Sequence, residues 1–112
     1  MLAATPQLRI VLTTVANPEE AERLARALVE ERLAACVSFL PAARSIYRWQ
    51  GRIESAEETL LLLKTAEEKL AALEARIKEL HSYQTPEFVV LKAAAGSQDY
   101  LEWLLASLAA ER

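Results

Sequence analysis

SIYRWQGRIES, residues Ser45–Ser55, carries the clearest β-hairpin signal in this chain. Gln50 and Gly51 stand at its centre, and glycine readily adopts the positive φ angles that tight hairpin turns require. Apolar and charged residues alternate on both sides of the turn, which is the pattern of two paired strands. The stretch therefore predicts a β-hairpin. We expect one side to carry Tyr47, Trp49 and Ile53, and the other to carry Arg48, Arg52 and Glu54.

The residues before the hairpin predict a strand, a helix and a second strand. LRIVLTTV (Leu8–Val15) is rich in β-branched residues and predicts a mostly buried strand. Asn17, followed by proline and two glutamates, is typical of a helix start. The second strand begins near Ala34 and bends at Pro41 before it continues to Trp49, because proline cannot donate to the ladder. The helix is expected to bury Ala21, Leu24, Ala25 and Leu28.

The residues after the hairpin predict a third strand, a helix, a fourth strand and a last helix. TLLLLK ends a strand near Lys64, and Thr65 with a glutamate three residues later fits a capping box. A loop (81–87) leads into the strand EFVVLK, and the last helix starts after Gly96 and Ser97. The apolar seam of the first of these helices is Ala66, Leu70, Leu73, Ile77 and Leu80. The apolar side of the last helix is Tyr100, Leu101, Leu104, Leu105 and Leu108.

The order of these elements, β-α-β-β-α-β-α, predicts an α+β fold. Its first six elements match the ferredoxin-like βαββαβ pattern, an antiparallel sheet with both helices on one face, and the C-terminal helix is an addition. We expect residues 1–112 to form one domain. TLLLLK and FVVL place apolar side chains on both faces of the sheet, so the helix-free face needs a cover. We expect further copies of the chain to supply it.

The composition argues against several classes of function. The net charge of −3 gives no general attraction to nucleic acid. The single cysteine, Cys36, can form no disulfide within the chain, and its apolar strand favours packing over reactivity. Two glycines and one histidine offer neither a phosphate loop nor a Ser-His-Asp triad, so we expect no enzyme activity. No signal peptide or membrane-spanning segment is recognisable, so we expect a cytoplasmic protein with neither nucleic acid nor membrane as partner.

Several motifs together resemble the CutA family, the small proteins linked to divalent-cation tolerance. They are LAACVS (Leu33–Ser38), SIYRWQGRIE (Ser45–Glu54), LLLKT (Leu61–Thr65), HSYQTPE (His81–Glu87) and YLEWL (Tyr100–Leu104). Their order and spacing agree with the family across essentially the whole chain. The resemblance implies a tight homotrimer of ferredoxin-like subunits, whose sheets face one another and whose strands extend across subunits. It also implies an architecture similar to that of the PII signalling proteins, which bind small effectors between subunits.

The resemblance further implies copper or another divalent cation as a ligand, with none obligatory. The chain differs from some family members at positions that matter for metal: Thr13 or Thr14 replaces a cysteine, Leu80 a histidine, and Gln50 an acidic residue. We therefore expect weak metal binding. His81 is the candidate metal ligand, because imidazole suits copper and zinc. The alternative is a polar residue at the C-terminal end of a helix.

A second candidate site consists of aromatic and polar residues from the matched motifs. Two roles are open to them, the lining of a cleft between subunits or the trimer interface itself, where aromatic residues are enriched. These residues are Tyr47, Trp49, Lys64, Tyr83 and Glu87. Glu54, Glu57 and Glu58 also stand close together, and we expect them on a solvated face.

These observations lead to one main functional hypothesis and two alternatives. The main hypothesis is a homotrimeric divalent-cation (copper) tolerance protein with weak metal binding. The first alternative is a PII-like regulatory module that binds a small effector in the inter-subunit cleft. The second is a trimeric scaffold for a partner protein.

Overall fold

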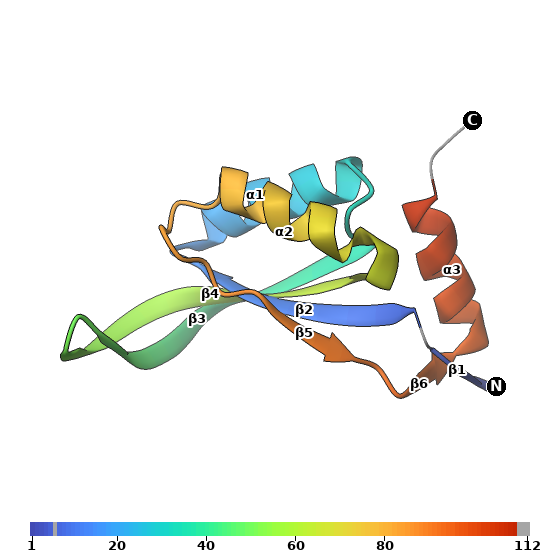
Figure 1. Ribbon diagram of the computed structural model, residues 1–112, viewed down its shortest axis with the longest axis horizontal. Coiled ribbons are helices and arrows are strands. Elements are labelled where there is room, and N and C mark those ends of the chain that lie inside the picture. Colours follow the sequence, from blue (N-terminus) through green and yellow to red (C-terminus); the bar gives the residue numbers. More distant parts are fainter. Residues whose placement is uncertain (6, 110–112) are drawn as a thin grey trace.

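The computed structural model describes residues 1–5 and 7–109 (Figure 1). Its main sheet consists of β2 (Leu8–Val15), β3 (Cys36–Trp49), β4 (Arg52–Ala66) and β5 (Val89–Lys92). The helices are α1 (Pro18–Glu30), α2 (Leu70–Leu80) and α3 (Gln98–Leu108), and a 3-10 turn (Glu67–Lys69) precedes α2. A small second sheet pairs β1 (Leu2–Ala4) with β6 (Ala95–Ser97).

The strands of the main sheet lie in the order β3-β4-β2-β5, and every neighbouring pair is antiparallel. The helix α1 connects β2 to β3, yet β4 separates these two strands in the sheet. This is the split βαβ arrangement of ferredoxin-like folds. The predicted α+β class and antiparallel sheet are therefore confirmed. Sequence reasoning does not predict β1 and β6, which place the first residues of the chain beside the start of α3.

The helices α1 and α2 cover one face of the main sheet (Figure 1). They pack against alternate residues of β2 and β4, because alternate side chains of a strand share a face. From the sheet, the buried core contains Val11, Val15, Leu61 and Leu63. From the helices, it contains Ala21, Leu24, Leu28, Leu73 and Ile77. The buried stripe predicted for the first helix is confirmed.

In the part of the chain that the structure describes, no helix covers most of the opposite face of the sheet (Figure 1). Ile10, Leu12, Leu60 and Leu62 point to this helix-free face, where they stay partly exposed. Among the described elements, only α3 covers the end of this face. There, Leu104 and Leu108 form a second buried cluster with Leu8, Ala35 and Ala66. The uncovered apolar face that the leucine run predicts is thus present in the single chain.

Beyond the rest of the sheet, β3 and β4 extend as a two-stranded arm (Figure 1). The pairing register shifts between Leu40 and Ala43, and Ala42 has a φ of 63°. A bulge of this kind inserts extra residues into one strand and bends it. The predicted bend at Pro41 is confirmed, and it lies where the arm leaves the sheet.

The turn at the tip of the arm decides which side chains share a face. Gln50 and Gly51 form it, with φ angles of 50° and 79°, and it pairs Trp49 with Arg52. A two-residue turn places odd-numbered residues of β3 opposite even-numbered residues of β4. The predicted grouping of Ile53 with the two aromatic residues is therefore wrong. The side chains that share a face are Tyr47, Trp49, Arg52 and Glu54.

The start of α2 also differs from the prediction. Thr65 remains in β4, where it is buried and its hydroxyl donates to the carbonyl of Leu33 at 2.7 Å. No described side chain caps the 3-10 turn or α2. The predicted capping box is wrong, because Thr65 finds its partner in the interior rather than at a helix start. In the predicted seam, Leu73 and Ile77 are fully buried, whereas Leu80 is 37% exposed.

Candidate functional site

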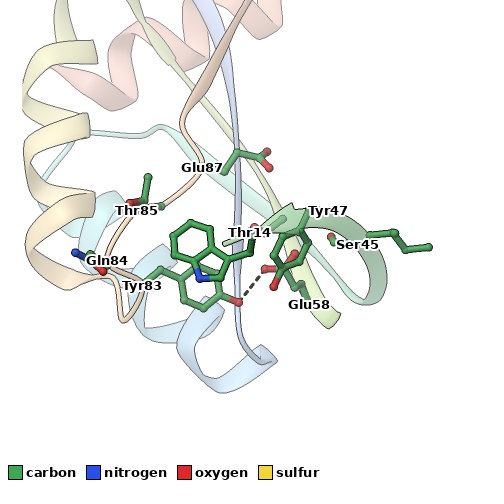
Figure 2. A pocket seen from close by; sticks show the side chains of 11 residues that line it. Thr14, Ser45, Tyr47, Glu58, Tyr83, Gln84, Thr85 and Glu87 are labelled. Atoms are coloured by element: carbon green, nitrogen blue, oxygen red, sulfur yellow. Dashed lines mark hydrogen bonds between the residues drawn. The ribbon is translucent and has the colours of Figure 1, made fainter. Parts of the chain in front are cut away.

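A pocket lies between the arm, the end of β2 and the loop that follows α2. Its volume is about 720 Å³, which is within the range of small-molecule sites. Figure 2 shows Gln84 and Thr85 of the loop on one side of the pocket and Ser45 of the arm on the other. The aromatic and acidic lining residues are Tyr47, Trp49, Glu58, Tyr83 and Glu87.

Tyr83 and Glu58 make the best-defined polar contact in the pocket. The phenol of Tyr83 donates a hydrogen bond of 2.8 Å to Oε2 of Glu58 (Figure 2). Burial raises the pKa of Tyr83 above its ordinary value, and the hydrogen bond to Glu58 and the negative charges of Glu58 and Glu20 raise it further. At neutral pH, Tyr83 is therefore a protonated phenol that donates to Glu58.

The loop that carries Tyr83 is attached to the sheet through His81. Nε2 of His81 donates to the carbonyl of Thr14 at 2.7 Å, and Nδ1 accepts from the amide N–H of Tyr83 at 3.0 Å. A carbonyl only accepts and an amide N–H only donates, so these contacts fix the tautomer with hydrogen on Nε2. The His81 side chain is buried. Both ring nitrogens thus serve to hold the loop.

Glu20 of α1 attaches the next residue of the same loop. Its carboxylate accepts from the amide and the hydroxyl of Ser82, at 3.1 and 2.9 Å. Glu20 is itself buried, in the first turn of α1, where a negative charge is favourable. Together, Glu20 and His81 fix the position of the loop after α2 (residues 81–87, the pocket loop) against the helix layer and the sheet.

The structure brings most of the second predicted set together. Tyr47, Trp49, Tyr83 and Glu87 all line the pocket. Lys64 lies elsewhere, with its Nζ 5.7 Å from the centroid of the Tyr100 ring. Cys36, partly exposed at the start of β3, pairs with Lys64 across the sheet. His81 is the C-cap residue of α2, the position that its alternative interpretation expects.

Glu58 is the pocket residue that sequence reasoning misses. Glu54 and Glu57 are exposed, but Glu58 is only 7% exposed, so the predicted solvated face is wrong for it. It pairs with Ala43, directly after the bulge in β3. One signal was available in the sequence: Glu58 lies two residues before the apolar run Leu60–Leu63, where β4 enters the interior.

The raised pKa of Tyr83 predicts a loss of stability at alkaline pH. Above the ordinary tyrosine pKa of about 10, the unfolded chain releases the phenolic proton while the folded chain retains it. The unfolded state then binds fewer protons, so the free energy of unfolding falls as pH rises. We expect a smaller fall in Tyr83→Phe, measured by urea unfolding from neutral to alkaline pH. Glu58→Gln should give an intermediate fall, because burial of the phenol remains. Parallel curves for wild type and Tyr83→Phe would contradict this assignment.

Residues 9–107 match the family described as CutA1 divalent ion tolerance protein. This chain belongs to that family. The divalent-cation tolerance protein CutA of Thermus thermophilus is 50% identical over 95 residues, which cover 85% of this chain and 92% of that protein. The structure of CutA from Synechococcus elongatus has a TM-score of 0.94 and 45% identity, and the match covers 97% of this chain and 96% of that one.

Two further CutA proteins are informative, one for its bound ligand and the other for the compartment in its name. A second structure of Synechococcus elongatus CutA, 43% identical with a TM-score of 0.89, is complexed with a Bis-Tris molecule; the match covers 96% of this chain and 99% of that one. The Arabidopsis thaliana CutA protein is named chloroplastic, and it is 41% identical over 95 residues, 85% of this chain and 52% of that protein. In the described part of this chain, the helices are too short or too polar to cross a membrane. The names of the family and of the Thermus thermophilus protein refer to divalent-ion or divalent-cation tolerance and not to an enzymatic reaction.

Proposed function

We propose that this CutA chain serves divalent-cation tolerance as a homotrimeric regulatory module that binds a small effector in its pocket. The pocket itself carries the proposal, because three separate segments build it and its wall includes the buried Glu58 and the half-buried Tyr83. His81 and Glu20 hold the pocket loop in place, so the site has a defined shape. We propose that residues 1–112 act as one domain in the cytoplasm, without catalytic activity.

The helix-free face of the sheet supports assembly into a trimer. Ile10 and Leu12 are partly exposed there, and their partners Leu91 and Val89 on the edge strand β5 are 44% and 45% exposed. Exposed apolar patches mark protein interfaces, and an edge strand offers unpaired backbone groups to a neighbouring chain. Further copies of the chain, arranged with closed symmetry, would cover both features.

Copper is the second ligand that we propose, and the geometry favours weak binding. In the described residues, no group of three or more His, Cys, Asp or Glu side chains is placed to hold a metal ion. A copper ion at His81 must also displace either the Thr14 carbonyl or the Tyr83 amide from a ring nitrogen. A metal site that costs a buried hydrogen bond and offers one imidazole cannot be tight.

Calorimetric titration with copper tests this second proposal. We expect a weak binding curve that does not saturate at micromolar copper, and a reduced heat in His81→Ala. Circular dichroism of the variant would show that the fold is retained, and Cys36→Ser would serve as a control for thiol binding. Saturation at submicromolar copper would contradict the proposed weak site, and an unchanged curve in His81→Ala would remove His81 from it.

A thermal-shift screen tests the proposed effector site. A ligand present at about 100 times its Kd stabilises the folded state by about 2.7 kcal/mol, so binding raises the melting temperature. We expect a stabilising compound to act on wild type and on Trp103→Leu, but only weakly on Trp49→Leu. Trp103 is the matched control, because it is also an exposed indole, 49% against 48%, and lies on α3 away from the pocket. Equal stabilisation of both variants would place the ligand elsewhere.

The Bis-Tris complex of the Synechococcus elongatus protein supports the same proposal. It indicates that a CutA chain of 43% identity can hold a small organic molecule. A screen of this chain should therefore avoid organic buffers, which would compete with the compounds tested.

A further inference from the structure

Glu58 is a buried carboxylate whose charge the described residues leave uncompensated. Its Oε2 accepts from Tyr83, whereas its Oε1 has no hydrogen bond within the described part of the chain and stays accessible on the pocket wall. No lysine, arginine or histidine in the same residues forms an ion pair with it. Buried charges in proteins are normally paired with a counter-charge, because desolvation otherwise costs too much. A positively charged ligand in the pocket would supply the counter-charge that Glu58 lacks within the described residues.

The rest of the pocket lining also favours a positively charged ligand. Glu87 adds a second carboxylate, and none of the lysines, arginines or histidines that the structure describes lines the pocket. Two carboxylates in the lining disfavour anions such as phosphates and carboxylates. A positively charged ligand is the occupant that these charges select.

Aromatic rings distinguish an organic cation from a metal ion. Tyr47, Trp49 and Tyr83 line the pocket, and the negative face of an aromatic ring attracts an ammonium group. A bare metal ion would need several ligands at short distance, and no such group of side chains is present in the described residues. A volume of about 720 Å³ is also far larger than a metal site requires.

We propose that the pocket binds a small organic cation, either a protonated amine or a quaternary ammonium compound. Oε1 of Glu58 supplies the counter-charge, and the rings of Trp49 and Tyr47 contact the alkyl groups around the nitrogen. The hydroxyls of Thr14 and Ser45, which also line the pocket, are placed to bind polar substituents of the ligand. This inference rests on the proposed function, because it names the chemical class of the effector for the same site.

Choline and its neutral carbon isostere, dimethylbutanol, test the charge requirement directly. Each is titrated in phosphate buffer into the full chain carrying Trp103→Phe, so that Trp49 is the only indole. We expect choline to change the Trp49 fluorescence, and the isostere to bind roughly tenfold more weakly, since it keeps the shape but loses the cation–π and ionic attraction. Equal affinity of the two compounds would overturn the proposal.

Matched carboxylate variants locate the counter-charge. Glu58→Gln keeps an acceptor for Tyr83 but removes the charge, and we expect it to weaken choline binding about tenfold. Glu57→Gln is the control, because Glu57 is the neighbouring exposed carboxylate outside the pocket lining, and we expect it to leave binding unchanged. Equal melting temperatures of the two variants would show that both are folded. Unchanged choline affinity in Glu58→Gln would overturn the assignment.

The same fluorescence assay separates failure of this inference from failure of the proposed function. If zinc or copper, rather than choline, changes the Trp49 signal in a Glu58-dependent way, the pocket is a metal site and the organic cation is wrong. If acetate, glucose or another anionic or neutral compound binds instead, the effector site stands but its chemical class is wrong. If no amine, polyol, carboxylate or metal ion changes the signal, both proposals fail.

Discussion

Leu62→Glu is expected to convert the proposed trimer into monomers. Leu62 lies in the centre of β4 and points to the helix-free face, where it is partly exposed in the single chain. In a trimer whose sheets face one another, each copy would bury one glutamate without a partner. The effective cost of burying an ion is several kcal/mol, and it is incurred once per subunit. Sedimentation velocity at micromolar concentration would measure the change from a trimeric to a monomeric mass.

Val29→Glu is the matched control for this experiment. Val29 is a 41% exposed apolar residue on α1, on the side of the molecule opposite the helix-free face. We expect its variant to stay trimeric, because the introduced charge remains in water. A trimeric Leu62→Glu would show that this face is not the interface. A wild-type chain that sediments as a monomer would contradict the assembly itself.

The sequence predicts the main elements well because hydrophobic periodicity reports burial. Leu8–Val15 has the bounds of β2, and the buried stripe of α1 matches its apolar spacing. In TLLLLK, Leu61 and Leu63 face the helices, while Leu60 and Leu62 face the opposite side of the sheet. The uninterrupted apolar run therefore indicates that both faces of this strand are apolar. This is why a cover for the second face can be inferred from sequence.

Local patterns fail where a long-range contact decides the outcome. Thr65 fits a capping box by spacing, but its hydroxyl reaches the carbonyl of Leu33 across the fold. The sequence pattern predicts the wrong face of the arm for Ile53. A difference of one residue in the strand pairing moves every side chain of a strand to the other face. Both errors come from interactions that a window of neighbouring residues does not contain.

The candidate site could be predicted only in part. Tyr47 and Trp49 share a face because they are two residues apart, and family motifs connect them with Tyr83. Glu58 joins the site through a bond to a residue 25 positions away, and His81 through a bond to Thr14, 67 positions away. No spacing rule links such pairs. The structure therefore adds Glu58, the residue on which the proposed chemistry of the pocket depends.

Leu61→Ala is expected to lower the free energy of unfolding by about 2–5 kcal/mol. Leu61 is 0% exposed and belongs to the core between β4 and the two helices, with Leu28 and Ile77. Truncation removes its apolar contacts and leaves a cavity that the packed neighbours fill only partly. Guanidinium unfolding at one fixed protein concentration would measure the loss, because unfolding coupled to dissociation depends on concentration.

Leu80→Ala is the control that connects this loss to burial rather than to the residue type. Leu80 is 37% exposed at the end of α2, so its truncation removes less buried surface, and we expect a smaller cost of about 1–1.5 kcal/mol. Leu61→Ala should also stay trimeric in sedimentation, because its side chain faces the helices and not the neighbouring subunit. Equal costs for the two variants would contradict the assignment of Leu61 to the core. Dissociation of Leu61→Ala would show that the two faces of β4 do not act independently.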